Sequence, residues 1–222
     1  MKQTFFNLIA CILFALAFPA CGHAASTPIP ADSVITLLKP DKSLDVSLMQ
    51  ALSDRKSQRE FADKPLSLED LSSLLWAANG INREDGRRTA PSAINAQDID
   101  IYVCLANGAY LYNAKQNQLV RVCTNDLRQA VAGRQPVVAP AFLVLVADLS
   151  RYPERMLSQR QLVESFACMD AGYVSQNICL YCSAAKLATV PRASMDKEAL
   201  TKALNLTDNQ FPVLNNPVGY MK

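Results

Sequence analysis

The sequence predicts an α+β fold, with helices that flank a central sheet rich in antiparallel strands. The segment Asp100–Leu105 alternates like a strand, and Asn107-Gly108 then predicts a tight hairpin turn into a second strand at Tyr110–Tyr112. The continuous apolar run Ala141–Ala147 is typical of a strand that is buried on both faces. A helical pattern over about 158–187 supplies the longest helix, so strands and helices are interspersed along the chain.

Two helices are expected before the first strand. Asp45–Ser53 predicts a short helix with one buried apolar face. That face consists of Val46, Met49 and Leu52. Ser67 is an N-cap residue, and acidic side chains follow it in the first turn of a predicted helix over Leu68–Ala78. Asn79-Gly80 is expected to end that helix.

The remaining elements are short, apart from the long helix. We expect strands at Leu119–Val122, Thr189-Val190 and Val218–Tyr220, and helices at Asp126–Ala132 and Asp196–Leu204. The long helix is expected to be interrupted at Gly172, because glycine is a poor helix former.

The chain is expected to hold one folded domain. Its 222 residues are 50% hydrophobic and 19% charged, which is enough apolar material for a single core. Residues 25–44 carry Pro28, Pro30 and Pro40, and they predict an extended N-terminal arm. Residues 45–222 form the predicted domain.

The first residues are typical of an export signal. Lys2 gives a basic start, and the apolar run Phe5–Phe18 is 14 residues long, shorter than the ~20 residues that a membrane-spanning helix needs. We therefore predict that residues 1–24 are a signal peptide, and we expect no stable membrane span. An alternative is a lipid anchor on Cys21, as in bacterial lipoproteins. In both cases the protein is expected in the bacterial periplasm or at the cell surface.

Charge and histidine content exclude several classes of function. The formal net charge of +2 gives no basic field that would attract nucleic acid, so a small-molecule substrate is expected. The one histidine, His23, lies within the predicted signal peptide. The mature chain therefore cannot use a Ser-His-Asp or Cys-His mechanism, nor a zinc site with histidine ligands, and no metal site is predicted.

The cysteines do not form a disulfide framework, because five of them, an odd number, follow the predicted signal peptide. Cys179 and Cys182 form a C-x-x-C pair, which is typical of thiol oxidoreductases and of half a zinc site. The pair lies deep in an apolar helical run, whereas a reactive pair belongs at a helix N-terminus. We favour buried helix cysteines and keep the thiol oxidoreductase as an alternative.

A cluster of cations follows the first predicted helix. Arg55, Lys56 and Arg59 lie within five residues, together with the hydroxyl of Ser57. Arginine forks match the oxygens of a phosphate group, which accept several charge-assisted hydrogen bonds. The cluster alone is compatible both with a phosphate site and with a solvated helix end.

Eight segments stand in a distinctive order along the chain. They are Arg55–Phe61, Leu68–Gly80, Arg88–Asn95, Ala139-Pro140, Asp170–Gly172, Gln176-Asn177, Leu187–Val190 and Val218–Tyr220. Their order resembles the FMN-dependent nitroreductase family, most closely its small, exported, thiazole-oxidase-like branch. The resemblance covers about residues 45–222. Its Arg-x-Ser-x-Arg and Pro-Ser-x-x-Asn patterns are specific as an ordered pair, although each is common alone.

The resemblance implies an α+β sandwich that forms a homodimer, with two FMN molecules at the dimer interface. Four residues would hold the phosphate, ribitol and pyrimidine edge of FMN: Arg55, Lys56, Ser57 and Arg59. Four residues of the partner subunit would line the isoalloxazine ring: Pro91, Ser92, Ala93 and Asn95.

The rest of the implied site comes from the second half of the chain. Gln135 would contact the flavin pyrimidine, and the segment with Thr189, Val190 and Ala193 would pass the ring with backbone N–H groups toward N5 and O4. Lys222 would stand in for the basic residue that many members carry in a C-terminal tail. Ala193 departs from the family, since Ala193-Ser194 stands where a Glu-Gly pair is frequent.

The resemblance also implies an activity. The protein would be an exported oxidoreductase that transfers a hydride between a donor and a small organic acceptor through FMN, with NAD(P)H as the family's usual electron donor. Because the flavin carries the chemistry, no catalytic side chain is predicted. One alternative is an azoline-type dehydrogenase on the same fold. Another is a degenerate domain that binds flavin without turnover.

Several of these residues also have purely structural interpretations. Ser92 and Asn95 are suited to cap the turn that leads into Ile99. Trp76 is expected in the core, and Asp170 and Gln176 are expected to be structural or interface polar residues. Three tyrosines are expected to be half-buried: Tyr110, Tyr112 and Tyr173.

Overall fold

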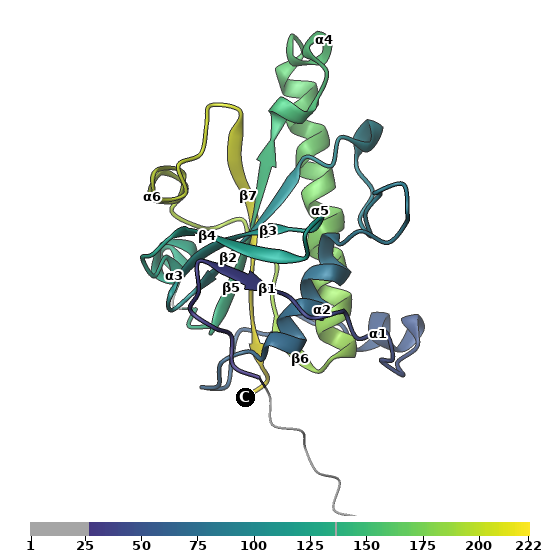
Figure 1. Cartoon of the computed structure of the whole chain (residues 1–222), viewed down its shortest axis with the longest axis vertical. Coiled ribbons are helices and arrows are strands. Elements are labelled where there is room, and N and C mark those ends of the chain that lie inside the picture. Colours follow the sequence, from purple (N-terminus) through teal and green to yellow (C-terminus); the bar gives the residue numbers. More distant parts are fainter. Residues whose placement is uncertain (1–26, 136) are drawn as a thin grey trace, which may run out of the picture.

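The computed structural model describes residues 27–135 and 137–222; the predicted signal peptide, residues 1–24, lies outside them, as does Cys21. Within the described residues, seven strands form one antiparallel sheet in the order β1-β4-β3-β2-β5-β7-β6 (Figure 1). Helices pack against both faces of this sheet. The predicted α+β fold is therefore confirmed.

Six of the seven described strands overlap predicted strand segments, the first lies in the predicted N-terminal arm, and the hairpin predicted at Asn107-Gly108 forms. Their bounds are β1 (Val34–Thr36), β2 (Ile99–Leu105), β3 (Gly108–Asn113), β4 (Gln118–Cys123), β5 (Ala141–Asp148), β6 (Leu187–Thr189) and β7 (Gln210–Tyr220). The hairpin joins β2 to β3. Gly108 in its turn has φ +136°, a conformation that side chains with a Cβ rarely adopt.

Most helices lie close to their predicted positions, but the short helix Glu154–Leu157 was not predicted. Their bounds are α1 (Leu48–Asp54), α2 (Leu68–Asn79), α3 (Arg128–Ala132), α4 (Glu154–Leu157), α5 (Arg160–Ala184) and α6 (Lys197–Ala203), with short 3-10 turns η1 (Ala93–Asn95) and η2 (Leu149–Arg151). As predicted, Ser67 caps α2, because its hydroxyl accepts the Asp70 N–H at 3.0 Å.

The centre of the molecule is β5, which is buried on both faces as the sequence predicts. Leu143 and Leu145 belong to the core under α2 and α5. Phe142 and Val144 belong to a second core, under α3 and α6. Because successive side chains of a strand point to opposite faces, this one strand joins the two cores.

The predicted interruption of the long helix is wrong. Helix α5 continues through Gly172 from Arg160 to Ala184. A glycine costs a helix only about 1 kcal/mol relative to alanine. Burial of one face of α5 against the sheet outweighs that cost, since Ala167, Val174 and Ile178 are almost completely buried.

The last strand is longer than predicted, because the two prolines within it argued against a strand in the sequence pattern. The expected strand Val218–Tyr220 is the end of β7, which is 11 residues long. Pro217 lies just beyond the end of β6, and Pro212 lies next to a register shift in the pairing with β5. Proline has no N–H group to donate. At these two positions the regular pairing with a neighbouring strand is already interrupted, so the missing donor disrupts few hydrogen bonds of the sheet.

The predicted buried face of the first helix is also wrong. In α1 the buried side chain is Ala51, whereas Met49 is 73% exposed and Leu52 is 44% exposed. Leu48 is 64% exposed as well. The periodicity is helical, but the small residue faces α5, so α1 presents apolar side chains to solvent.

The N-terminal arm is extended, as predicted, and it takes part in the sheet. Its residues Val34–Thr36 pair with β4 as an edge strand.

Among the aromatic residues, Trp76 is half-buried, and its Nε1 donates to the Ile81 carbonyl at 3.0 Å. Tyr110 and Tyr112 are buried and Tyr173 is 47% exposed, so the expectation of half-buried tyrosines is wrong: two lie in the core and one is exposed to solvent.

Candidate functional site

The cation cluster lies at the end of the molecule where α1, the C-terminal end of α5 and β6 meet. Helix α1 is held there by the Ser183 hydroxyl, which donates to the Ala51 carbonyl at 2.8 Å. The chain then leaves the helix, and the Gln58 N–H donates to the Thr189 carbonyl at 2.9 Å. Two segments that are far apart in the sequence, Arg55–Arg59 and Leu187–Thr189, therefore lie side by side.

A cavity of about 410 Å³ opens between these segments. Its lining includes Lys56, Gln58, Cys179, Lys186, Thr189 and Met221. The C-terminal residues close one side, since Phe61 pairs with Met221 and places Lys222 next to the cation cluster. The structure thus brings the predicted residues of the cluster together with Thr189 and Lys222.

The cluster has an excess of positive charge. Among the described residues, no ion pair involves Arg55, Lys56, Arg59 or Lys222, whereas Lys186 pairs with Asp54 at 3.4 Å. Burial raises the pKa of the Cys179 thiol, and the positive charge of Arg55 opposes that rise, which places Arg55 close to the cavity. Lys56 lines the cavity and Arg55 lies near it, so this side of the cavity is suited to an anion such as a phosphate group.

A buried arginine, which the sequence interpretation missed, lies beside the cluster. Arg192 is only 7% exposed, and its guanidinium donates to neutral acceptors: the Ala132 carbonyl at 2.7 Å, Asn215 Oδ1 at 3.2 Å and Gln135 Oε1 at 3.2 Å. Burial lowers the pKa of Arg192, and the nearby charge of Arg59 lowers it further. The sequence feature that could have indicated this arginine is its position as the one cation within the segment Thr189–Ala193.

This arginine also anchors the backbone after β6. The Arg192 N–H donates to the Asn215 carbonyl at 2.8 Å, and the Asn215 N–H donates back at 2.7 Å. Thr189 and Val190 are buried, whereas Ala193 is exposed. Gln135 is exposed and joins the same region through its contact with Arg192. The second predicted group of residues, from Gln135 to Ala193, is therefore assembled around Arg192.

The third predicted group, Pro91 to Asn95, forms a strained loop. Ile94, Asn95 and Gln97 have φ of 49°, 59° and 52°. The left-handed region costs a residue with a Cβ about 1–2 kcal/mol, and a β-branched residue there is a rare outlier. Ile94 and Asn95 are exposed, so burial of their side chains does not offset the free-energy cost of this backbone conformation. Strain of this kind is concentrated at functional sites.

Two hydrogen bonds hold this loop. The Ala93 N–H donates to Asp170 Oδ2 at 2.9 Å, and Ser92 Oγ accepts the Gln97 N–H at 2.8 Å. Ser92 therefore holds the turn that leads into Ile99 through Gln97, although its side chain does not cap η1. Asp170 is buried on α5, which agrees with a structural role, and Gln176 is exposed.

The loop and the cation cluster are far apart within one chain. Asp170 holds the loop and Ser183 holds α1, and these residues are thirteen positions apart on the same helix. A helix rises 1.5 Å per residue, so the two anchor points are about 20 Å apart. One chain thus presents two separate groups of predicted site residues along α5.

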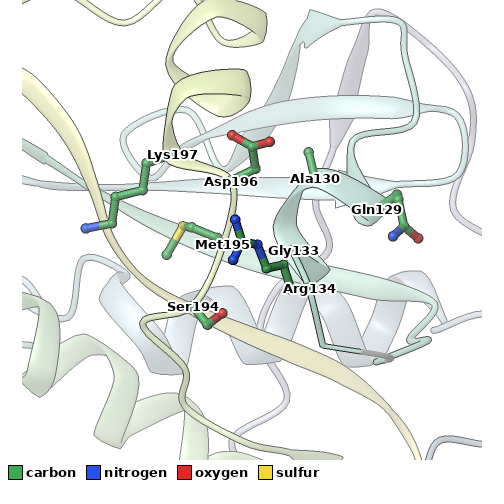
Figure 2. Close-up of a pocket in the computed structure, with 8 residues that line it drawn as sticks. All are labelled: Gln129, Ala130, Gly133, Arg134, Ser194, Met195, Asp196 and Lys197. Carbon is green, nitrogen blue, oxygen red and sulfur yellow. The ribbon is translucent and has the colours of Figure 1, made fainter.

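A larger cavity of about 740 Å³ lies between α3 and the segment before α6 (Figure 2). Arg134 points from the end of α3 toward Met195, whereas Lys197 points away from it. Asp196 is engaged as the cap of α6, because its Oδ1 accepts the Ala199 N–H at 3.0 Å. Ser194, the residue after Ala193, belongs to the lining of this cavity.

No group of three or more metal-ligating side chains comes together in residues 27–135 and 137–222. Likewise, none of the helices in these residues is long and apolar enough to cross a membrane.

The geometry of the C-x-x-C pair favours buried helix cysteines. Cys179 and Cys182 are 4% and 0% exposed and lie in the last turns of α5. Burial raises the pKa of both thiols, so little of the reactive thiolate forms.

We expect thiol reactivity to follow this burial. Brief treatment of the native protein with a maleimide should label the exposed Cys168 first, and it should leave Cys104, Cys179 and Cys182 unmodified. Peptide mass mapping identifies the labelled positions, with the unfolded protein as the control in which all of them react. Rapid native labelling of Cys179 and Cys182 would restore the thiol oxidoreductase as a candidate.

Comparison with known proteins agrees with this arrangement. The sequence pattern of the Nitroreductase family matches residues 52–220. A Ralstonia eutropha JMP134 protein of known structure, provisionally titled a nitroreductase, is 36% identical, with a TM-score of 0.80 over 90% of this chain and 95% of that one. A provisionally named nitroreductase of Methanocaldococcus jannaschii is 28% identical over 186 residues, which are 79% of this chain and 91% of the relative.

One further structural relative shows how widely the fold is used. The E. coli microcin synthetase McbBCD complex contains a chain with 20% identity and a TM-score of 0.64, over 84% of this chain and 78% of that one. At this identity the likeness concerns the fold alone. The family match and the Ralstonia relative together settle the assignment: the chain belongs to the nitroreductase family and is an oxidoreductase.

Proposed function

We propose that this oxidoreductase is FMN-dependent and transfers a hydride between a donor, such as NAD(P)H, and a small organic acceptor. The observation that carries the proposal is the group Arg55, Lys56 and Arg59, for which no ion pair is found among the described residues. This segment supplies Lys56 and Gln58 to the lining of the cavity of about 410 Å³. A phosphate group would neutralise these charges, and the arginine forks would hold it through charge-assisted hydrogen bonds.

Other residues at this end of the molecule would bind and orient the isoalloxazine ring system of FMN. Bound flavin supplies the hydride chemistry, so the protein needs no catalytic acid or base. Arg192 and Gln135 offer a cation and an amide beside the cluster, and the segment from Thr189 to Ala193 offers backbone groups. The fixed charge of Arg192 is suited to stabilise negative charge on a reduced cofactor.

The phosphate assignment predicts a specific loss of affinity. Changing Arg55 to alanine should weaken FMN binding by about 1.5–3 kcal/mol, because a charge-assisted contact is removed. Binding of riboflavin, which lacks the phosphate, should change little. Quenching of flavin fluorescence measures both affinities. Arg155→Ala, an exposed arginine on α4, is the matched control.

The outcomes separate the candidate functions. Equal weakening of FMN and riboflavin would remove Arg55 from the phosphate site. Failure of the wild type to bind flavin would favour the degenerate domain. If flavin binds, its bleaching by NAD(P)H supports the reductase, whereas bleaching by azoline substrates alone supports the azoline-type dehydrogenase and the thiazole-oxidase-like branch.

We also propose that the active form is a homodimer, with each flavin site shared by two subunits. The two groups of site residues, about 20 Å apart along α5, would then belong to two different sites. Exposed apolar side chains support this arrangement, and they occur on α1 and, about 20 Å away along α5, on the exposed face of that helix. They are Leu48, Met49, Leu52, Met169 and Tyr173.

Shared sites predict complementation between two defective chains. Asn95→Gly removes a loop side chain and tolerates the left-handed φ of 59°. Alone, the Asn95→Gly and Arg55→Ala chains should both bind FMN weakly. When the two are unfolded and refolded together, mixed dimers should carry one intact site each, so about a quarter of all sites recover. A flavin titration counts them, and no recovery would mean that each chain binds flavin alone.

Export is a separate part of the proposal, based on Lys2 and the apolar run Phe5–Phe18. Expression of the full chain in a bacterium should release a periplasmic protein that starts at Ala25, as intact mass shows. An acylated mass that disappears in the Cys21→Ser variant would show the lipid anchor instead. A product that retains Met1 would contradict both.

A further inference from the structure

A carboxyl group without a hydrogen-bond donor is buried behind the strained loop. Asp98, just before β2, is 0% exposed, and neither of its carboxylate oxygens has a donor in hydrogen-bonding geometry among the described residues. The neighbouring group is the carboxylate of Asp170, which is 3% exposed. The Tyr152 hydroxyl lies 3.4 Å from Asp170 Oδ2 and completes the cluster.

The other charged groups nearby already have partners. Arg151, on η2, is ion-paired with Asp100 and with Asp148. Arg88 donates to Gln97 Oε1 at 2.9 Å and to the Asn79 carbonyl at 2.9 Å. Neither arginine pairs with Asp98 or Asp170 among the described residues, so no cation compensates a second negative charge in the cluster.

Two adjacent buried carboxylates would be very unfavourable without such a cation, because each loses its hydration and repels the other. One proton between them removes the repulsion and gives the Asp98 carboxyl a hydrogen bond to donate. We propose that Asp98 and Asp170 form a carboxyl pair that shares one proton and positions the loop Pro91–Asn95, and that loss of this proton releases the loop.

The connection to the loop is direct. Asp170 Oδ2 accepts the Ala93 N–H at 2.9 Å, the hydrogen bond that holds the loop against α5. The left-handed residues Ile94 and Asn95 follow at once, so the loop needs an external contact to keep its conformation. Asp98 and Asp170 are positioning residues in this scheme, since they act on the loop rather than on a substrate.

The pH at which the proton is lost follows from the surroundings of Asp98. Burial raises its pKa to about 7, and the neighbouring Asp170 carboxyl contributes to the rise. The Tyr152 hydroxyl lies near Asp98 without a well-formed hydrogen bond to it, and it acts in the opposite direction. The folded chain therefore holds a proton that the unfolded chain releases near pH 4. The stability that this proton provides is complete below about pH 4 and declines as the pH rises toward about 7.

The first test needs no flavin. The free energy of unfolding of the flavin-free protein, measured with urea between pH 4 and pH 9, should fall as the pH rises to about 7 and then level off. Asp98→Asn keeps a donor toward Asp170 without a titrating proton, so this decline should disappear. Asp126→Asn, which removes a surface carboxylate paired with Arg128, is the matched control and should keep the decline.

The second test follows the loop through cofactor binding, and this arm rests on the proposed function. FMN affinity of the wild type should fall about tenfold more than that of Asp98→Asn between pH 5.5 and pH 8.5. The titration of the FMN phosphate itself cancels in this comparison. If the wild type binds no flavin at any pH, the proposed function fails, while the flavin-free measurement still decides the carboxyl pair.

A spectroscopic measurement covers the case in which the variant does not fold. The wild type should show the infrared C=O stretching band of a protonated carboxyl group at pH 5.5, and the band should disappear at pH 8.5. Absence of this band, or an equal decline of stability in the wild type and in Asp98→Asn, would overturn the proposal.

Discussion

Burial of β5 on both faces is the constraint on which the rest of the structure depends. A strand without a solvated face needs a hydrogen-bonded neighbour on each edge and apolar side chains above and below it. Strands β2 and β7 supply the edges, and the two cores supply the faces. The elements that cover β5 are also those that carry the candidate site: α5 on one face, α3 on the other, and β6 alongside β7.

Helix α5 converts this packing into a fixed spacing. Its buried side chains hold it against the sheet, while Asp170 and Ser183 reach from its side to the loop and to α1. Because a helix is stiff, the loop and the cation cluster cannot approach one another within a subunit. A site that uses both the loop and the cation cluster would form only when a second copy of the chain supplies one of the two groups. The exposed apolar side chains of α1 offer a surface that such a copy could cover.

The candidate site is also where the chain departs from the rules that it follows elsewhere. Arg55 and Arg59 carry unpaired charges, Arg192 is a buried cation among neutral acceptors, and Ile94 has a left-handed backbone. Burial of Arg192 and the left-handed backbone of Ile94 lower the stability of the folded chain, whereas Arg59 is exposed and its charge is solvated. A protein tolerates such departures where binding provides the compensation, which agrees with the cofactor site proposed above.

Local patterns determined much of this protein. The alternation before Asn107-Gly108, the apolar run of β5 and the cap at Ser67 depend on neighbouring residues, so the sequence alone predicted them. The order of the site segments likewise predicted the family. Tertiary structure decided the rest, because it depends on residues that are far apart along the chain. Packing against the sheet carried α5 through Gly172, and contact with α5 chose Ala51 as the buried residue of α1. The partners of Arg192 and the pairing of Asp98 with Asp170 exist only after folding, since no local pattern records which buried charges will meet.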